Sequence, residues 1–457
     1  MKRFDLVVIG AGPGGYVAAI RAAQLGMKVA VAERGKPGGV CVNWGCIPSK
    51  AILTSAGLFE EMKNAAAYGI RCQGVEADYG EVIRRSRKVA DRMSRGVAYL
   101  FKKNGIELFP AHATVASPTT VMAGDEILEA KNILVATGTS VKGLPGIEPD
   151  GRDVITSDDA LAQEALPRSV TVLGAGAVGV EFAYIYRAFG AEVSLVEMED
   201  QVLPRTDREV AEALAKSLKK QGIRILTSAP AKGYDKASRT LTVTAAGKEE
   251  TVRAEKLLVA VGRRVLSADL GLEACGVKVE RGFVQVDDRL RTACPTIWAI
   301  GDVTGGAMLA HKASAEGVAA AEAVAGRETA RRPNPDRIPS CVYCRPEVAS
   351  IGLTEEEAKK RGVECKTAKF PFTALGKAVA SGHTDGFVKM VAEAKYGEVI
   401  GCHIFGAGAP DMVGEMSLGR SLEATFREIG KTVHAHPTLS EAIREAALML
   451  GGEAIDI

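Results

Sequence analysis

The sequence predicts a doubly wound α/β pair of domains followed by an α+β domain. The chain has 457 residues, enough for about three domains at roughly 150 residues each. A short apolar strand, a glycine-rich turn and an amphipathic helix occur in that order near the N-terminus and again after residue 168. Beyond Pro339 the pattern changes to alternating apolar runs and a final helical segment from Leu439, which indicates an α+β domain.

The repeated pattern predicts two matching sets of elements. In order, the first set is a strand over Phe4–Ile9, a helix over Gly14–Gly26 and a strand over Lys28–Glu33. The second set is a strand over Ser169–Leu173, a helix over Gly179–Gly190 and a strand over Glu192–Glu197. Two further strands, Leu128–Thr137 and Lys256–Gly262, each run into a glycine turn. The C-terminal domain is expected to contain strands over Val348–Gly352, Gly386–Val391 and Gly397–Ile404.

Composition and charge exclude several classes of protein. Lys and Arg total 58 against 56 Asp and Glu, and this balance argues against nucleic-acid binding through bulk charge. The longest uncharged stretch, Leu6–Ile20, is too short to span a membrane. The start of the chain reads as a buried strand, not an export signal, so we expect a cytoplasmic protein. Nine scattered cysteines do not form the framework of a secreted, disulfide-rich domain.

The first glycine turn has the spacing of a dinucleotide-binding fingerprint. Gly10, Gly12 and Gly15 follow a strand and open a helix, where the glycines allow a tight turn, a close approach to a pyrophosphate and close helix packing. Free N–H groups at the helix N-terminus favour the pyrophosphate. Glu33, 23 residues after Gly10, ends the next strand and can accept from a ribose hydroxyl.

The fingerprint occurs a second time. Gly174, Gly176 and Gly179 repeat the spacing, and Glu197 again stands 23 residues after the first glycine. Glycine turns without a ligand are the alternative, which the double occurrence disfavours. An acid at this position would repel the 2′-phosphate of NADP, so the second site is expected to prefer NAD.

Two cysteines stand between the fingerprints, in the stretch Gly38–Lys50. Cys41 and Cys46 are spaced closely enough at a helix start to form a disulfide. A helix N-terminus and the nearby Lys50 lower the pKa of a thiol, which favours redox chemistry. Metal binding is disfavoured because Cys-x₄-Cys is not the usual zinc spacing and no second ligand pair lies near. We therefore expect no metal. The other close pair, Cys341 and Cys344, is interpreted as two ordinary buried cysteines.

Longer motifs add a family resemblance. Gly38–Lys50 resembles the redox-disulfide signature of the flavin-dependent pyridine nucleotide-disulfide oxidoreductases. The segment His434–Glu441 is similar to the branch of that family that oxidises dihydrolipoamide. Ala299–Val303 and Met308–Ala313 also match, so the resemblance covers essentially the whole chain.

The resemblance implies a domain plan. It consists of an FAD-binding first segment over 1–147, an NAD-binding domain over 148–264, a return segment of the FAD domain over 265–337 and a dimerisation domain over 338–457. The first two would be Rossmann-like. Pro145 and the proline-rich stretch Arg331–Pro339 agree with boundaries near 147 and 337.

The resemblance also implies where the cofactors bind. FAD would occupy the first fingerprint, with Glu33 on its adenosine ribose, Asp302 on the ribityl chain and Lys50 beside the flavin. The other FAD residues implied are Ala113, Thr137, Gly138, Thr139, Met308, Leu309, Ala310 and His311. NAD would contact the second fingerprint, Glu181, Glu197 and Gly262, and Glu181 would pair with Lys50.

In the implied reaction, His436, held by Glu441, acts as base toward a dihydrolipoyl thiol. The thiolate attacks Cys41 of a Cys41–Cys46 disulfide, and Cys46 passes two electrons to FAD and then NAD. The His–Glu pair would come from the second subunit of a homodimer. The dihydrolipoyl group would arrive on a lipoyl domain of the acyltransferase core of a 2-oxo acid dehydrogenase complex, or on the glycine cleavage lipoyl protein.

Three alternatives compete with this interpretation. A glutathione-reductase-like enzyme would need NADPH and arginines where Glu197 stands. A mercuric-reductase-like enzyme would have a cysteine pair near the C-terminus, which Gly451–Ile457 lacks. A flavoprotein scaffold without turnover would have no reason to keep Cys41, Cys46, His436 and Glu441 together. The chain departs from the family pattern at Val40 and Trp44, and neither departure removes a reacting group.

Overall fold

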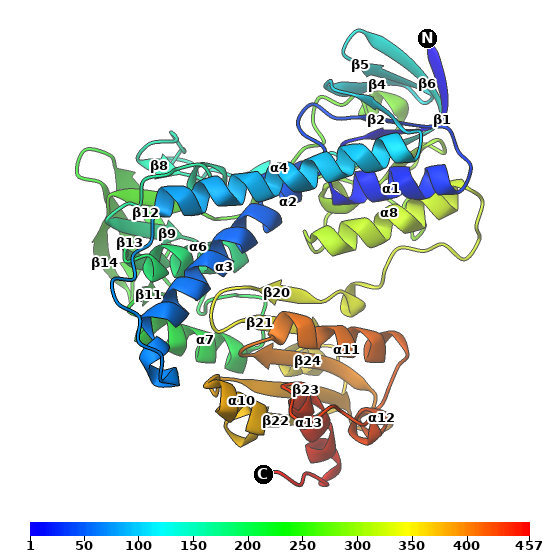
Figure 1. The fold of residues 1–457 in the computed structure, drawn as a ribbon. Helices are drawn as coiled ribbons and strands as arrows, with labels where there is room; N and C mark the ends of the chain where they lie inside the picture. The colour runs from blue at the N-terminus through cyan, green and yellow to red at the C-terminus, as the bar shows by residue number, and fades with distance from the viewer.

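The computed structural model describes residues 1–457, and the predicted fold class is confirmed: two α/β units precede an α+β unit. Figure 1 shows the N-terminal unit at the upper right, the second unit at the left and the C-terminal unit below both. The chain enters at the top and ends at the bottom of this view. The site described below lies where these units approach one another.

The first unit is built on a seven-stranded sheet in the order β3-β2-β1-β6-β5-β4, with β19 also paired to β6. Its strands are β1 Lys2–Ile9, β2 Val29–Ala32, β3 Glu107–Phe109, β4 Ala113–Ser117, β5 Thr120–Ala123, β6 Glu126–Val135 and β19 Ile297–Ala299. Its helices are α1 Pro13–Gln24, α2 Gly39–Trp44, α3 Cys46–Lys63, α4 Tyr79–Lys103 and α8 Ala310–Val324. β2 and the second half of β1, Leu6–Ile9, are wholly apolar because α1 and α8 cover one face of the sheet and loops and short strands cover the other.

The second unit repeats this arrangement with a five-stranded parallel sheet, β11-β10-β9-β15-β8. Its elements are β8 Val154–Ile155, α5 Ser157–Ala160, β9 Ser169–Leu173, α6 Ala177–Ala188, β10 Glu192–Val196, α7 Arg208–Lys220, β11 Arg224–Leu226 and β15 Lys256–Val259. A three-stranded antiparallel sheet packs beside it: β12 Ala231–Asp235, β13 Thr240–Ala245 and β14 Lys248–Arg253. The small pairs β7 Thr139–Val141 with β16 Arg263–Val265, and β17 Val279–Glu280 with β18 Phe283–Val284, belong to the connections.

The C-terminal unit is an antiparallel sheet in the order β20-β21-β24-β23-β22. Its strands are β20 Ser340–Val342, β21 Val348–Gly352, β22 Cys365–Pro371, β23 Phe387–Glu393 and β24 Val399–Phe405. Its helices are α9 Glu355–Lys360, α10 Gly376–Ser381, α11 Ala409–Ser421, α12 Phe426–Lys431 and α13 Glu441–Gly451. The predicted strand over Val348–Gly352 is correct to the residue, and the other two predicted strands are shifted by a few residues.

Small residues bring α1 and α8 into close contact. A Cβ on Gly317 of α8 would lie 2.5 Å from the carbonyl oxygen of Gly14, and a Cβ on Gly14 would lie 3.0 Å from that of Ala313. Neither position therefore admits a larger residue without a shift of the backbone. The close packing holds the N-terminus of α8 against the first glycine turn.

The domain limits predicted at 147, 264 and 337 stay predictions, although β19 shows that the chain returns to the first sheet after completing the second. No helix combines the length and the apolar character needed to cross a membrane.

Candidate functional site

The predicted cysteine pair stands at a break between two helices. Cys41 lies in the short helix α2, and Cys46 is the first residue of α3, with Gly45, at φ −154° and ψ −112°, between the helices. The sequence predicted that both cysteines lie at the start of one helix, whereas the structure divides the segment between two helices. Buried Asn43 donates to the carbonyl oxygens of Lys36, Pro37 and Gly39 at 3.0–3.3 Å, which fixes α2 on the loop before it.

Both cysteines are free thiols in the structure, so the predicted disulfide stays a prediction. Cys46 accepts a hydrogen bond from the Cys41 thiol, and this bond, together with the Lys50 ammonium, lowers the pKa of Cys46 to about 7. Its position at the N-terminus of α3 is one where the helix dipole also favours a thiolate. The same hydrogen bond and burial raise the pKa of Cys41. The two sulfur atoms therefore differ in role: Cys46 is the better leaving group.

A pair of charges joins the first unit to the second beside these thiols. Lys50 Nζ donates to both carboxylate oxygens of Glu181, at 3.1 and 3.0 Å, and Glu181 is only 5% exposed. The backbone N–H of Tyr343, from the C-terminal unit, donates to the same carboxylate at 3.0 Å. The Lys50 ammonium lies 4.5 Å from the centroid of the Tyr343 ring. The predicted Lys50–Glu181 contact is present in the structure, and Tyr343 is a participant that no sequence motif indicated.

The two glycine turns have the same geometry. A Cβ on Gly10 would lie 2.4 Å from the Ala136 carbonyl oxygen, and one on Gly174 would lie 2.6 Å from that of Ala260. Gly15 and Gly179 would clash in the same way, each with the carbonyl oxygen of the first glycine of its own turn, at 1.9 and 1.8 Å.

Gly12 and Gly176, in contrast, face open space, because no atom lies within 4 Å of the place where a Cβ would stand. The helices α1 and α6 have no side-chain cap and no acidic residue in their first turns. Each turn is therefore a cradle that fits a pyrophosphate at an uncapped helix N-terminus.

The two predicted acids stand at equivalent places. Glu33 and Glu197 each accept from a backbone N–H of their own glycine turn, at Ala11 and Ala175, both at 2.7 Å. Each also accepts from a backbone N–H two residues further along, at 2.7 and 3.0 Å. A carboxylate oxygen has a second lone pair, so both acids keep the capacity to accept from a ribose hydroxyl.

Exchanging Gly176 for alanine is expected to weaken NAD binding while leaving the fold intact. The backbone there is extended, with φ −70° and ψ −178°, so alanine fits the chain but fills the cradle. We expect the KM for NAD to rise at least about tenfold, and the free energy of unfolding to stay within about 0.5 kcal/mol. Steady-state kinetics and urea titration measure the two quantities. An unchanged KM would contradict a pyrophosphate at this turn.

The remaining predicted FAD residues lie on several segments that surround or follow the first sheet. Asp302 stands in a short 3₁₀ turn after β19 and accepts from the Thr139 hydroxyl at 2.7 Å. Thr139 in turn accepts from Arg263 at 2.7 Å, and the Thr137 hydroxyl donates to the Leu266 carbonyl at 2.6 Å. The others are placed as follows: Gly138 has a left-handed φ of +67°, Ala113 is buried at the start of β4, and Met308, Leu309, Ala310 and His311 form the entry to α8. Gly262, the last predicted NAD residue, follows β15 with a φ of +119° and open space beside it.

A buried cluster of charges, missed at the level of sequence, holds the turn that contains Asp302. Lys312 Nζ donates to the carbonyl oxygens of Gly301 and Gly305 at 3.1 and 2.8 Å and contacts Glu316 at 3.1 Å. Glu316, with no exposed surface, accepts from the Gly301 N–H at 2.8 Å and from Arg332 at 2.7 Å. Lys312 lies within the matching motif Met308–Ala313, but nothing in the sequence indicated Glu316 or Arg332.

Replacing Lys312 by methionine is expected to lower the free energy of unfolding by about 3 kcal/mol. The change leaves the buried Glu316 carboxylate with one cation fewer and two carbonyls of the turn without a donor. Urea denaturation gives the stability, and gel filtration gives the fraction of FAD retained, which should fall. The matched control is Lys359→Met in the exposed Lys359–Glu355 pair, which should leave the free energy of unfolding nearly unchanged. Equal effects of the two variants would contradict the assignment.

The C-terminal histidine pair is present but lies apart from the thiols of its own chain. His436 Nδ1 lies 2.9 Å from Glu441 Oε1, and the other oxygen of Glu441 accepts from the Thr438 N–H at 2.9 Å. The His436 side chain is 77% exposed. In Figure 1, α13 lies at the bottom of the molecule, whereas α2 lies between the two upper units. His434 makes a separate pair with Glu415 at 2.9 Å and does not contact His436 or Glu441 by a hydrogen bond.

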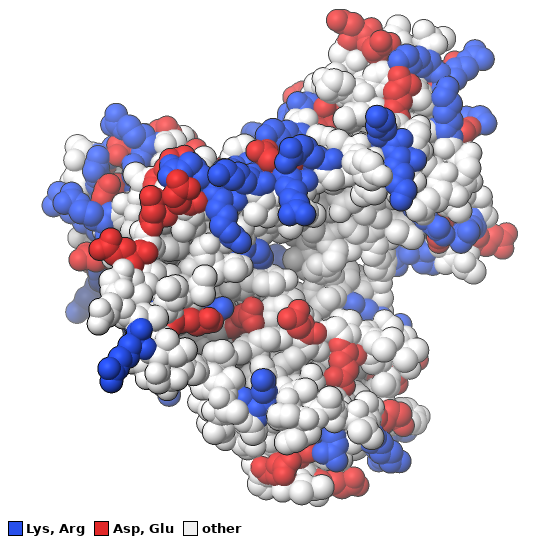
Figure 2. Space-filling view, in the orientation of Figure 1, with Lys and Arg blue, Asp and Glu red and all other residues white.

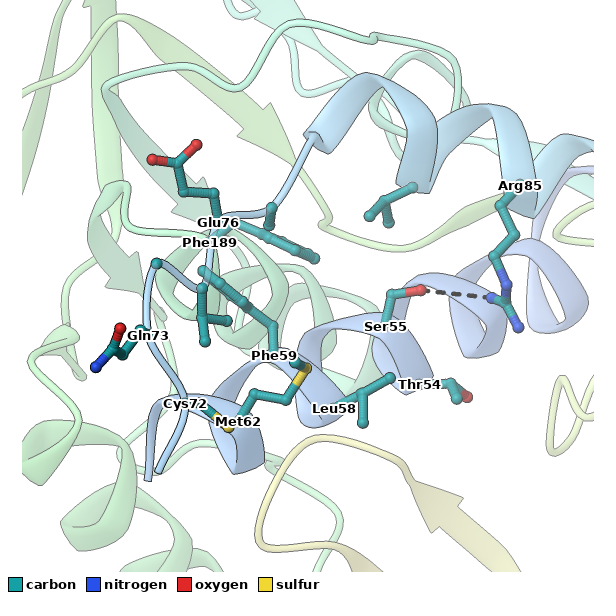
Figure 3. Close-up of a pocket in the computed structure, with 14 residues that line it drawn as sticks. Thr54, Ser55, Leu58, Phe59, Met62, Cys72, Gln73, Glu76, Arg85 and Phe189 are labelled. Atoms are coloured by element: carbon teal, nitrogen blue, oxygen red, sulfur yellow. Dashed lines mark hydrogen bonds between the residues drawn. The ribbon is translucent and has the colours of Figure 1, made fainter. Parts of the chain in front are cut away.

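A cavity of about 600 Å³ lies away from these residues, along the outer side of α3 (Figure 3). Phe59 and Phe189 stack on its wall with ring centroids 5.8 Å apart, and Arg85 donates to the Ser55 hydroxyl. None of the predicted site residues lines this cavity. Nor does the structure contain a group of three or more His, Cys, Asp or Glu side chains placed to hold a metal ion.

Comparison with known proteins gives consistent matches over the whole chain. Residues 4–317 match the family model described as pyridine nucleotide-disulphide oxidoreductase, and residues 338–447 match the dimerisation-domain model of that family. Dihydrolipoyl dehydrogenase of Zymomonas mobilis is 46% identical, with 99% of each chain covered. Dihydrolipoyl dehydrogenase of Chlorobaculum tepidum is 45% identical, with 97% of this chain and 96% of the relative covered.

Solved structures give the same picture. LpdA from Mycobacterium tuberculosis superimposes with a TM-score of 0.90 at 29% identity, covering 98% of this chain and all of that chain. The HOCl-induced flavoprotein disulfide reductase RclA from Escherichia coli superimposes with a TM-score of 0.84 at 25% identity, covering 97% and 99% of the two chains.

Proposed function

Because the chain belongs to the pyridine nucleotide-disulphide oxidoreductase family, we propose that it oxidises dihydrolipoyl groups with NAD as the final acceptor and FAD as the resident cofactor. The observation that supports this most directly is the low-pKa Cys46 beside Cys41 and the Lys50–Glu181 pair. Glu197 at the second glycine turn favours NAD over NADP. The relatives at 45–46% identity are dihydrolipoyl dehydrogenases, which favours the dihydrolipoyl group as substrate.

The residues present fit both cofactors. The first glycine turn, Glu33 and Asp302 would hold FAD, and the second turn, Glu181 and Glu197 would hold NAD. When bound, FAD and NAD would supply the two-electron chemistry that reoxidises the reduced cysteines. The protein itself supplies thiol exchange, proton transfer and orientation.

The exchange begins with His436. Glu441 accepts at Nδ1, which leaves Nε2 free to take the proton of a dihydrolipoyl thiol. The resulting thiolate attacks Cys41 of the oxidised pair, forming a mixed disulfide and releasing Cys46 as a thiolate. The second dihydrolipoyl thiol then attacks the lipoyl sulfur of the mixed disulfide, so lipoyl disulfide leaves and the proton of that thiol passes to the released Cys41 thiolate. Two electrons thereby pass from the substrate to the cysteine pair.

The reduced pair is expected to titrate near pH 7. Below this pH Cys46 is protonated, and above it the thiolate predominates, because the Cys41 hydrogen bond and Lys50 stabilise the charged form. The difference in thiolate absorbance between the reduced protein and its Cys46→Ser variant should rise with a midpoint of about 7. Lys50→Met should move that midpoint upward by removing the cation. If the midpoint of Lys50→Met equalled that of the wild type, the proposed role of this lysine would be contradicted.

The proposal is tested by steady-state turnover of the purified protein. We expect NAD reduction with dihydrolipoamide, and little turnover with NADPH and glutathione disulfide. Preference for the second pair of substrates would overturn the proposal in favour of a glutathione-reductase-like enzyme.

The match to a dimerisation domain supports a homodimer. We propose that the protein works in the cytoplasm and that its substrate arrives on a carrier protein. The carrier would be a lipoyl domain of a 2-oxo acid dehydrogenase complex or the glycine cleavage lipoyl protein. The dimer would place His436 of each subunit next to the thiols of the other.

A further inference from the structure

The helix α4 presents an exposed row of cations beside the redox pair. α4 contains eight Lys and Arg residues against two acids, whereas the whole chain has a net charge of only +2. Figure 2 shows Lys and Arg gathered along this helix, above a hollow that separates it from the C-terminal unit. This helix therefore holds a local excess of positive charge that the rest of the chain compensates.

The spacing of these residues puts five of them on one face. The buried residues of α4 follow a helical repeat from Ile83 to Phe101. On the opposite face, residues three, four or seven apart form a row that we call the basic stripe, made of Arg85, Lys88, Arg92, Arg95 and Lys102, all exposed. The stripe is roughly 25 Å long at 1.5 Å per residue.

The structure leaves most of this charge unpaired. The acids of α4 pair elsewhere: Glu81 with Arg84, and Asp91 with Lys36. The side chains of Lys88, Arg92 and Arg95 make no hydrogen bond or ion pair with any residue of the chain. Like charges three and four residues apart on a helix destabilise it, so the stripe is not explained by the stability of α4.

Contacts from the same helix connect the stripe to the redox pair. Asn43 and Trp44 lie between the two cysteines in sequence, and Arg87 contacts both. It donates to the Asn43 carbonyl at 2.6 Å, and its guanidinium lies 4.2 Å from the centroid of the Trp44 ring. Arg85, the first member of the stripe, donates to the Ala51 carbonyl of α3 at 2.9 Å. The stripe therefore begins beside α3, the helix that presents Cys46, and extends away from it.

We infer that the basic stripe is the docking surface for the carrier that brings the dihydrolipoyl group, and that the carrier meets it with an acidic face. This inference rests on the proposed function. Unpaired surface cations attract an acidic partner over about a Debye length and raise its association rate, without forming a tight complex. Fast and weak docking suits a carrier that must leave after each exchange. Nucleic acid is the less favoured partner, because Tyr99 is the one exposed aromatic side chain of α4 and no stacking platform accompanies it.

The test compares a carrier-borne with a free substrate. The stripe variant is Lys88→Glu/Arg92→Glu/Arg95→Glu. The matched control is Lys216→Glu/Lys219→Glu/Lys220→Glu, which makes the same charge change at exposed, unpaired lysines of α7. Each holoenzyme is assayed with NAD and either free dihydrolipoamide or an isolated lipoyl domain of net negative charge with its lipoyl group reduced.

At low salt, the stripe variant should lower the ratio of kcat/KM for the lipoyl domain to kcat/KM for dihydrolipoamide about tenfold. The difference should vanish at about 0.5 M salt, and the α7 variant should keep the wild-type ratio. An unchanged ratio in the stripe variant, or an equal fall in the α7 variant, overturns the inference. Dissociation of the dimer in the stripe variant also overturns the inference. A stripe variant that loses affinity for a duplex oligonucleotide while its kcat/KM ratio is unchanged overturns it as well. Failure of the wild type to turn over free dihydrolipoamide overturns the proposed function itself, which separates the two results.

Discussion

Replacing Cys46 by serine is expected to reduce NAD-linked oxidation of dihydrolipoamide to background, a loss of at least about 10⁴-fold. Serine keeps the size of the side chain but cannot form the disulfide or leave as a stable thiolate. The loss should fall on kcat, because Cys46 acts after the substrate has bound. It should be seen equally with free and carrier-borne substrate.

A spectroscopic result should accompany the kinetic one. Two-electron reduction of the wild-type holoenzyme should produce a long-wavelength charge-transfer band, and Cys46→Ser should lack it. Cys41→Ser should also lose turnover but keep a thiolate at Cys46. The matched control is Cys72→Ser, since Cys72 is exposed and lies outside the pair. A band that survives in Cys46→Ser would mean that the two cysteines have been assigned to the wrong roles.

Features that depend on short-range patterns could be predicted from the sequence. The two glycine turns and their acids were placed correctly because strand, turn and acid lie within about 25 residues, and the helix geometry between them is fixed. The second predicted strand of the first unit ran one residue too far. Glu33 leaves the strand because its carboxylate turns back to the Ala11 N–H.

Contacts between distant segments could not be predicted in this way. Tyr343 reaches Glu181 from another unit, 162 residues away in sequence, and no periodicity or spacing indicates such a meeting. The cluster around Glu316 depends on Arg332 arriving from the chain beyond α8. The structure also places the Trp44 ring against the Arg87 guanidinium, 43 residues away in sequence. The partner of an exposed aromatic ring depends on which helix the fold brings alongside, and that is a property of the whole fold.

His436→Gln is expected to lower turnover of dihydrolipoamide by about 10²- to 10⁴-fold near neutral pH. Glutamine can accept a hydrogen bond but cannot take the proton of the substrate thiol. The loss should shrink as the pH rises, because the substrate thiol then ionises without a base. Rates measured from neutral to alkaline pH give this profile. A loss that stayed constant with pH would instead indicate that His436 holds the substrate in place.

The exposed position of His436 makes a stronger experiment possible. Within one chain no hydrogen bond connects His436 to the helices of the cysteine pair, and 77% of its side chain is exposed. A site shared between subunits predicts that two inactive variants complement each other. In a hybrid dimer of one Cys46→Ser subunit and one His436→Gln subunit, the intact Cys46 of one chain meets the intact His436 of the other. One of the two sites is then complete, and the hybrid should show about half of the wild-type turnover.

If each site were formed within one chain, both sites of the hybrid would contain a defect and the hybrid would be inactive. The hybrid can be isolated with two different affinity tags, and the two parent homodimers, carried through the same exchange, serve as controls. Recovery of turnover cannot come from improved folding of either variant, because both parents remain inactive after the same treatment. It would require that His436 act on the cysteine pair of the neighbouring subunit, so that the dimer, and not the single chain, is the catalytic unit.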